Sequence, residues 1–114
     1  MKEQRKHQRR HLIMYLKVYD VEANQLLGHL GDINPEGIML VSEAPIETNK
    51  EFHLKMLLPR EYTDQPFEFK ARSLWCRNDI NPIFYDTGFE LLDQRNKDFV
   101  FIRELIEELG FQEA

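Results

Sequence analysis

The sequence predicts a mainly β domain, in which six short antiparallel strands form a small barrel and one amphipathic helix follows them. Two observations predict this fold. Six segments rich in apolar, β-branched and aromatic residues are separated by turn residues, and the period changes to that of a helix only near the C-terminus. A chain of 114 residues, 42% of them hydrophobic, is enough for one domain with its own core. We expect the helix to cover an open edge or mouth of the barrel.

The first three strands are expected over residues 12–20, 25–32 and 37–42. Apolar side chains occupy every second position of the first strand, and residues 22–24 form a plausible turn after it. The tetrapeptide from Asn34 to Gly37 reads Asn-Pro-Glu-Gly, which matches the residue preferences of a type I turn. It therefore predicts a hairpin between the second and third strands.

The last three strands are expected over residues 51–58, 67–75 and 83–92. Apolar and polar residues alternate clearly in the fourth strand. In the fifth, the same alternation predicts one buried face made of Phe67, Phe69, Ala71, Ser73 and Trp75. Gly88 interrupts the sixth strand and is expected at a β-bulge.

A helix is expected over residues 96–109, where apolar residues recur at helical spacing. Asn96 or Asp98 can cap its N-terminus, and Gly110 lies just beyond its end. The expected organisation is a flexible basic arm over residues 1–11 and a barrel with its C-terminal helix over residues 12–114.

Charge is unevenly distributed along the chain, whose net charge is −5. The arm holds five basic residues and one acidic residue, or +4, so the remaining ten basic and nineteen acidic residues carry −9. A basic arm on an acidic body indicates an anionic ligand for the arm and argues against a surface that coats nucleic acid. The alternative is a terminus that only adds solubility.

Several classes of site find no support in the sequence. The single Cys76 excludes an internal disulfide and a multi-cysteine metal site, and it fits a reducing cytosol. His7 and His11 are four residues apart, but no third ligand accompanies them, so no metal site is expected. No catalytic or cofactor-binding motif occurs, which predicts a protein that is not an enzyme and holds no cofactor. Without a long apolar run or a signal peptide, we expect a cytoplasmic protein with no membrane insertion.

Two patterns favour binding of an anionic nucleotide. Arg5 and Arg9 form an R-x-x-x-R pair, which Lys6 and Arg10 overlap in a second possible register. Guanidinium groups present planar donor forks that suit phosphate oxygens and the O6/N7 edge of guanine. A mobile arm with several such groups can close over a nucleotide.

The second pattern lies in a tetrapeptide, Asp-Ile-Asn-Pro, that occurs at residues 32–35 and again at 79–82. Only the first copy continues to a glycine, Gly37, which allows a positive φ or the close approach of another group. Asp32 has acceptor oxygens that can pair with the N1–H and N2–H₂ groups of guanine. We expect the first copy to face a ligand and the second to be a simple connection.

Together these motifs resemble the PilZ domain family, whose signatures are RxxxR and, after the second strand, [D/N]xSxxG. Residues 71–75 (ARSLW) and 86–93 (DTGFELLD) also look like the closing strands of that family. The resemblance covers essentially the whole chain. It implies a six-stranded β-barrel that binds the bacterial second messenger cyclic di-GMP. It also implies that Arg5 and Arg9 clamp the ligand with Arg10 as an accessory, that Asp32 accepts from guanine, and that Gly37 permits close approach.

The expected function is a cyclic di-GMP receptor and adaptor, whose arm changes conformation on binding and relays the signal to an unidentified protein partner. A monomer or weak homodimer is expected, with no nucleic acid bound. Asn34 stands where the family has serine; its amide keeps a donor and an acceptor, and we retain it as a ligand contact. The alternative is a PilZ adaptor that acts only through protein contacts, independently of ligand.

Overall fold

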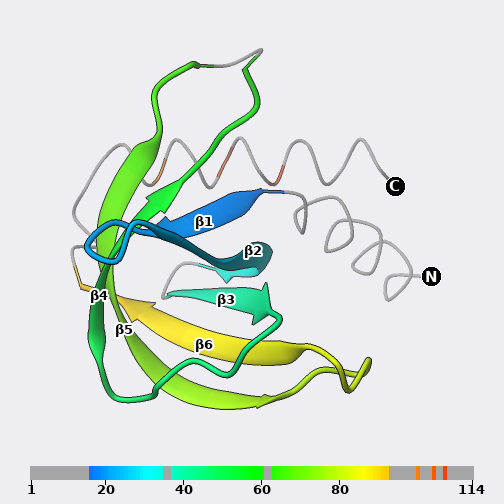
Figure 1. The fold of residues 1–114 in the computed structure, drawn as a ribbon. Coiled ribbons are helices and arrows are strands. Elements are labelled where there is room, and N and C mark those ends of the chain that lie inside the picture. Colours follow the sequence, from blue (N-terminus) through cyan, green and yellow to red (C-terminus); the bar gives the residue numbers. More distant parts are fainter. Residues whose placement is uncertain are drawn as a thin grey trace.

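The described part of the chain is a closed six-stranded barrel (Figure 1). The computed structural model describes residues 16–34 (of Asn34 only the backbone), 37–60 and 63–92, and the single positions Val100, Glu104 and Glu107. Its strands are β1 (Lys17–Asp20), β2 (Gln25–Asn34), β3 (Gly37–Ser42), β4 (Glu51–Met56), β5 (Phe67–Asn78) and β6 (Tyr85–Leu91). Every pair of neighbours is antiparallel, in the order β1-β2-β3-β6-β5-β4.

The predicted six-stranded antiparallel barrel is confirmed. Each described strand overlaps the segment expected for it, although β5 continues to Asn78 and β6 begins only at Tyr85. Of the two places expected for the helix, an open edge does not exist among the described strands, because β1 pairs with β4 on one side and with β2 on the other; a mouth of the barrel stays a prediction. That pairing closes the sheet on itself.

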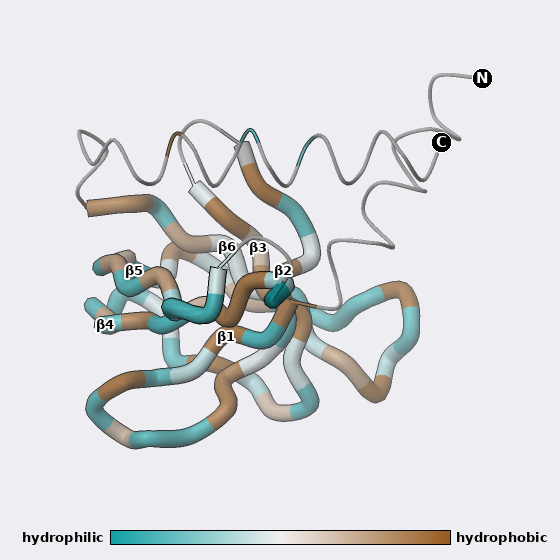
Figure 2. Tube along the Cα trace, turned by 90° about the horizontal axis from the view of Figure 1, so that it is seen from above, coloured by the Kyte–Doolittle hydropathy of each residue, from teal (hydrophilic) through white to brown (hydrophobic). Residues whose placement is uncertain are grey.

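Side chains from all six strands fill the barrel interior. In β4, Phe52, Leu54 and Met56 are buried while the residues between them are more exposed, as the alternation predicts. Figure 2 shows the same alternation of hydrophobic and hydrophilic residues along β4 and β5. The ring of Phe52 meets that of Phe89 from β6 edge to face, with centroids 5.7 Å apart. The contact therefore joins two strands that do not pair with each other, on either side of β5.

Three irregularities interrupt the pairing of the strands. The register shifts between β1 and β2 next to Val18, between β2 and β3 at Gly31, and between β5 and β6 at Leu74. At each shift two residues of one strand oppose one residue of its partner, so the alternation of faces restarts. The bulge expected at Gly88 lies in the neighbouring strand, where Leu74 is the extra residue.

The second copy of the repeated tetrapeptide forms the connection between β5 and β6, as predicted. The Asp79 carboxylate accepts from the Asn81 backbone N–H at 3.1 Å, and the Asn81 side chain accepts from the Ile83 N–H at 3.3 Å. The Asp79 N–H donates to the Phe84 carbonyl at 3.0 Å. This tip extends beyond the barrel wall in Figure 1, with Ile80 98% exposed.

The predicted arm over residues 1–11 lies outside the described residues, as does most of the predicted helix over residues 96–109. The described positions of that segment, Val100, Glu104 and Glu107, are in helical conformation and exposed. Among the residues that the structure describes, no helix has the length and apolar character needed to cross a membrane.

Candidate ligand-binding site

The structure describes part of the predicted ligand site. It describes Asp32 and Gly37 in full and the backbone of Asn34, whereas Arg5, Arg9 and Arg10 lie outside the described residues. Asn34 at the end of β2 pairs with Gly37 at the start of β3. A two-residue connection therefore joins the strands, which confirms the predicted hairpin.

A bulge at Gly31 directs Asp32 to the outer face of the barrel. Leu30 pairs with Leu40, both fully buried, whereas Asp32 pairs with Met39. Without the extra residue Asp32 would occupy an inward position, because successive side chains of a strand point to opposite faces. The Asp32 carboxylate accepts a hydrogen bond from the Ile33 N–H at 2.8 Å, which helps to orient it.

Gly37 has a structural role within the barrel wall. A Cβ atom at this position would collide with the backbone carbonyl oxygen of Phe89 in β6. Positive φ is not the reason for a glycine here, since none of the described glycines has one. The sequence allows two reasons for a glycine here, a positive φ or the close approach of another group, and the second applies. The group that approaches Gly37 is the backbone of β6.

Trp75 lies on the outer face, so its predicted place on the buried face is wrong. Phe67, Phe69, Ala71 and Ser73 are buried as predicted, but Trp75 is 39% exposed. The cause is the bulge at Leu74: Ser73 pairs with Phe89, and Trp75 with the preceding residue, Gly88. A uniform alternation cannot reveal this extra residue. Trp75 is thus a candidate functional residue that sequence reasoning missed.

The two bulges place Asp32 and Trp75 in one row across the outer face. Asp32 pairs with Met39, Met39 with Gly88, and Gly88 with Trp75. The Trp75 indole lies against Gly88, where a Cβ atom would collide with the ring. The absence of a side chain at Gly88 therefore lets the indole lie close to the strand.

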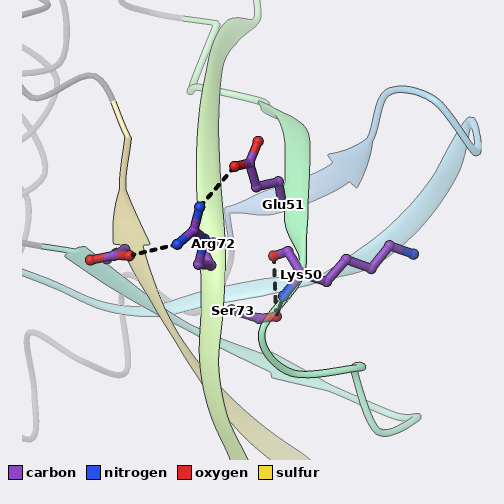
Figure 3. Close-up of polar contacts among 5 residues, drawn as sticks. Lys50, Glu51, Arg72 and Ser73 are labelled. Atoms are coloured by element: carbon purple, nitrogen blue, oxygen red, sulfur yellow. Dashed lines mark hydrogen bonds and ion pairs between the residues drawn. The ribbon is translucent and has the colours of Figure 1, made fainter.

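Two arginines of β5 flank Trp75 and have different surroundings. Arg72 donates to Glu51 at 2.8 Å and lies 4.0 Å from Glu90, so two carboxylates balance its charge (Figure 3). The guanidinium carbon of Arg77 instead lies over the Trp75 ring, 4.6 Å from its centroid.

Within the described part of the chain, no group of three or more His, Cys, Asp or Glu side chains could hold a metal ion.

Comparison with family models identifies the fold. The PilZ domain model matches residues 3–110, nearly the whole sequence. The chain belongs to the PilZ domain family. This match confirms the resemblance drawn from the arginine and Asp32–Gly37 motifs. It also places both motifs within the span of the PilZ domain.

A solved structure has the same fold as this PilZ domain. The structure of the Bacillus subtilis inhibitor of motility (MotI/DgrA) superposes with a TM-score of 0.54 at 18% sequence identity. The match covers 81% of this chain but 46% of that chain, so the PilZ domain spans about half the length of this neighbour. A comparison with curated protein sequences finds no match.

Proposed function

We propose that this PilZ domain is a non-catalytic receptor for cyclic di-GMP that relays the ligand signal to a partner protein. One observation carries the proposal: Asp32 of the second motif lies in the same outer row as the exposed Trp75. A guanine base needs an acceptor at its edge and a flat surface for its face. The row provides one of each.

Each residue of the proposed site has a distinct chemical task. The Asp32 carboxylate accepts from the N1–H and N2–H₂ groups of a guanine, and Trp75, with the Arg77 guanidinium group over its ring, provides a flat surface for a base. Arg5 and Arg9, with Arg10 as an accessory, donate to phosphates and to the O6/N7 edge. The two phosphates of the ligand are attracted by the +4 charge of the arm.

The proposed output is contact with another protein. The structural neighbour is named as an inhibitor of motility, so its name describes an action on a cellular process by a protein that contains this fold. In this PilZ domain, closure of residues 1–11 over the ligand would present a new surface to a partner. Ordering of that segment costs conformational entropy, which lowers the affinity for ligand.

Isothermal titration of cyclic di-GMP into the chain at near-physiological salt tests the receptor function. We expect saturable binding with a micromolar or lower Kd, and the stoichiometry will distinguish one ligand from an intercalated pair. Single-stranded DNA should not compete for the site. Absence of heat together with an unchanged melting temperature would overturn the receptor function.

A ligand-independent adaptor is the second candidate, and Asn34 is the observation that favours it. The side chain at this position is larger than the serine of the family motif, and Pro35 restricts the Asn34 backbone to extended conformations. If the wild-type chain does not bind ligand, the Asn34→Ser variant tests whether Asn34 is the cause. Binding gained by that variant would identify a PilZ adaptor that has lost its ligand.

A further inference from the structure

We infer that Arg77 is a further ligand contact, whose guanidinium plane stacks on one guanine base of cyclic di-GMP. This inference rests on the proposed function and assigns a residue that lies outside both signature motifs. It comes from the position of Arg77 on Trp75, from the absence of a carboxylate partner for Arg77 among the described residues, and from the glycine under the indole.

Arg77 lies beside Trp75 near the end of β5. Arg77 follows Trp75 by two residues in β5, so both side chains emerge on the outer face. Its cross-strand neighbour is Asp86, next to the row that contains Asp32 and Trp75. The guanidinium group therefore lies at the border of the proposed site.

The guanidinium group of Arg77 has different neighbours from that of Arg72. Among the described residues, no carboxylate lies within ion-pair distance of Arg77, whereas Arg72 of the same strand has two such neighbours. A guanidinium group that rests on an aromatic ring keeps its in-plane N–H donors available. Arg77 thus combines a cationic planar surface with donors that form no ion pair with a described carboxylate, although Asp86 is its cross-strand neighbour.

Gly88, Trp75 and Arg77 form a stack without any ligand present. Gly88 lets the indole lie close to β6, and the indole in turn supports the guanidinium group of Arg77. A long side chain held in this way loses less rotamer freedom when it binds than a mobile one. Arginine planes stack well on unpaired bases, because they match the flat and polarisable base face.

The test combines two readouts on the full chain with cyclic di-GMP as the probe. Calorimetry measures affinity, and the emission of Trp75 reports contact at this place, since the chain has one tryptophan. We expect ligand to change the emission of the wild type. Arg77→Ala should raise the Kd roughly five- to a hundredfold, the range expected for loss of one stacked base. Arg77→Lys should bind cyclic di-GMP as weakly as Arg77→Ala, because the lysine ammonium group keeps the charge but has no planar surface for stacking.

Arg60→Ala is the matched control, because it removes the same side chain and charge from an exposed loop position. Arg60 lies in the connection before β5, at the opposite end of that strand from Arg77 (Figure 1). Its Kd should stay within twofold of the wild type. Melting temperatures of all three variants should match the wild type, since both arginines are exposed.

The outcomes separate this inference from the proposed function. If the wild type binds and either Arg77 variant binds within twofold of it, the stacking role is overturned while the receptor function stands. Saturating ligand that leaves the Trp75 emission unchanged also overturns the stacking role. If calorimetry detects no binding to the wild type, the receptor function fails and the assignment of Arg77 fails with it.

Discussion

Ser73 in β5 donates a hydrogen bond from its Oγ to the backbone carbonyl of Glu47, 2.7 Å away. The same oxygen accepts from the Lys50 backbone N–H at 3.2 Å (Figure 3). One fully buried hydroxyl thus holds the connection between β3 and β4 against the barrel. It does so next to the bulge that directs Trp75 outward.

Ser73→Ala should lower the free energy of unfolding by about 1–3 kcal/mol, because it leaves two partly buried backbone groups without their partner. Urea denaturation of the variant and the wild type measures the difference. An unchanged unfolding midpoint would show that water or a backbone shift replaces the hydroxyl.

Thr87→Val should leave the stability unchanged or increase it by up to about 1 kcal/mol. The Thr87 hydroxyl is buried and has no hydrogen-bond partner among the described residues, so its removal loses no described contact and avoids a desolvation cost. The variant serves as a control for Ser73→Ala, since both remove a buried hydroxyl from neighbouring strands. A decrease of more than about 1 kcal/mol in the same denaturation experiment would reveal a contact to that hydroxyl.

Gly37→Ala should destabilise the barrel by about 1–3 kcal/mol, because the added methyl group meets the rigid backbone of Phe89. Gly88→Ala should cost less, since the group that it meets is the side chain of Trp75. Melting temperatures compare the two variants, and the emission of Trp75 should shift only in Gly88→Ala. Equal losses in both would contradict the difference between backbone and side-chain contacts.

Arg9→Ala should abolish most of the affinity for cyclic di-GMP and lower the melting temperature by no more than about one or two degrees. The reason is that the proposed task of Arg9 is to donate to the ligand, through bonds that each contribute about 1.5–3 kcal/mol. Calorimetry and thermal unfolding of the same preparation check both parts. Lys6→Ala, which removes one charge from the second register, is the control. A greater loss in Lys6→Ala would assign the clamp to Lys6 and Arg10.

Asn34→Ser should tighten binding of cyclic di-GMP about two- to tenfold, the equivalent of one neutral hydrogen bond of about 0.5–1.5 kcal/mol. The change restores the residue that the PilZ motif carries at this position. Parallel titrations of the variant and the wild type measure the ratio of Kd values. A weaker Ser variant would show that the asparagine amide makes a better contact than the hydroxyl.

The sequence predicts the strands well, because their inward positions repeat with a period of two. Phe52, Leu54 and Met56 are buried as that period requires. The prediction fails where one residue is added to one strand alone. Nothing local to Leu74 distinguishes a bulge from continued pairing, so the alternation predicts the wrong face for Trp75. Only the partner strand, with Gly88 opposite Trp75, shows the shift.

The same reason limits what the sequence says about the site. The motif from Asp32 to Gly37 can be recognised because its residues are neighbours in the chain. Its relation to Trp75 and Arg77 depends on pairing across four strands. A glycine such as Gly37 can be required by a positive φ or by close packing, and the sequence does not distinguish the two. The contact with Phe89 that decides between them appears only when β3 and β6 pair.

The closed order of the strands constrains how a partner protein can recognise this domain. Each of the six described strands pairs with two neighbours, so none presents a free row of backbone N–H and C=O groups along its whole length. A partner strand can therefore add only to a short stretch that has one described neighbour, such as residues 74–78 of β5, which pair with β6 alone. Over the rest of the barrel, recognition depends on side chains and connecting loops, which single substitutions can alter while the fold is preserved.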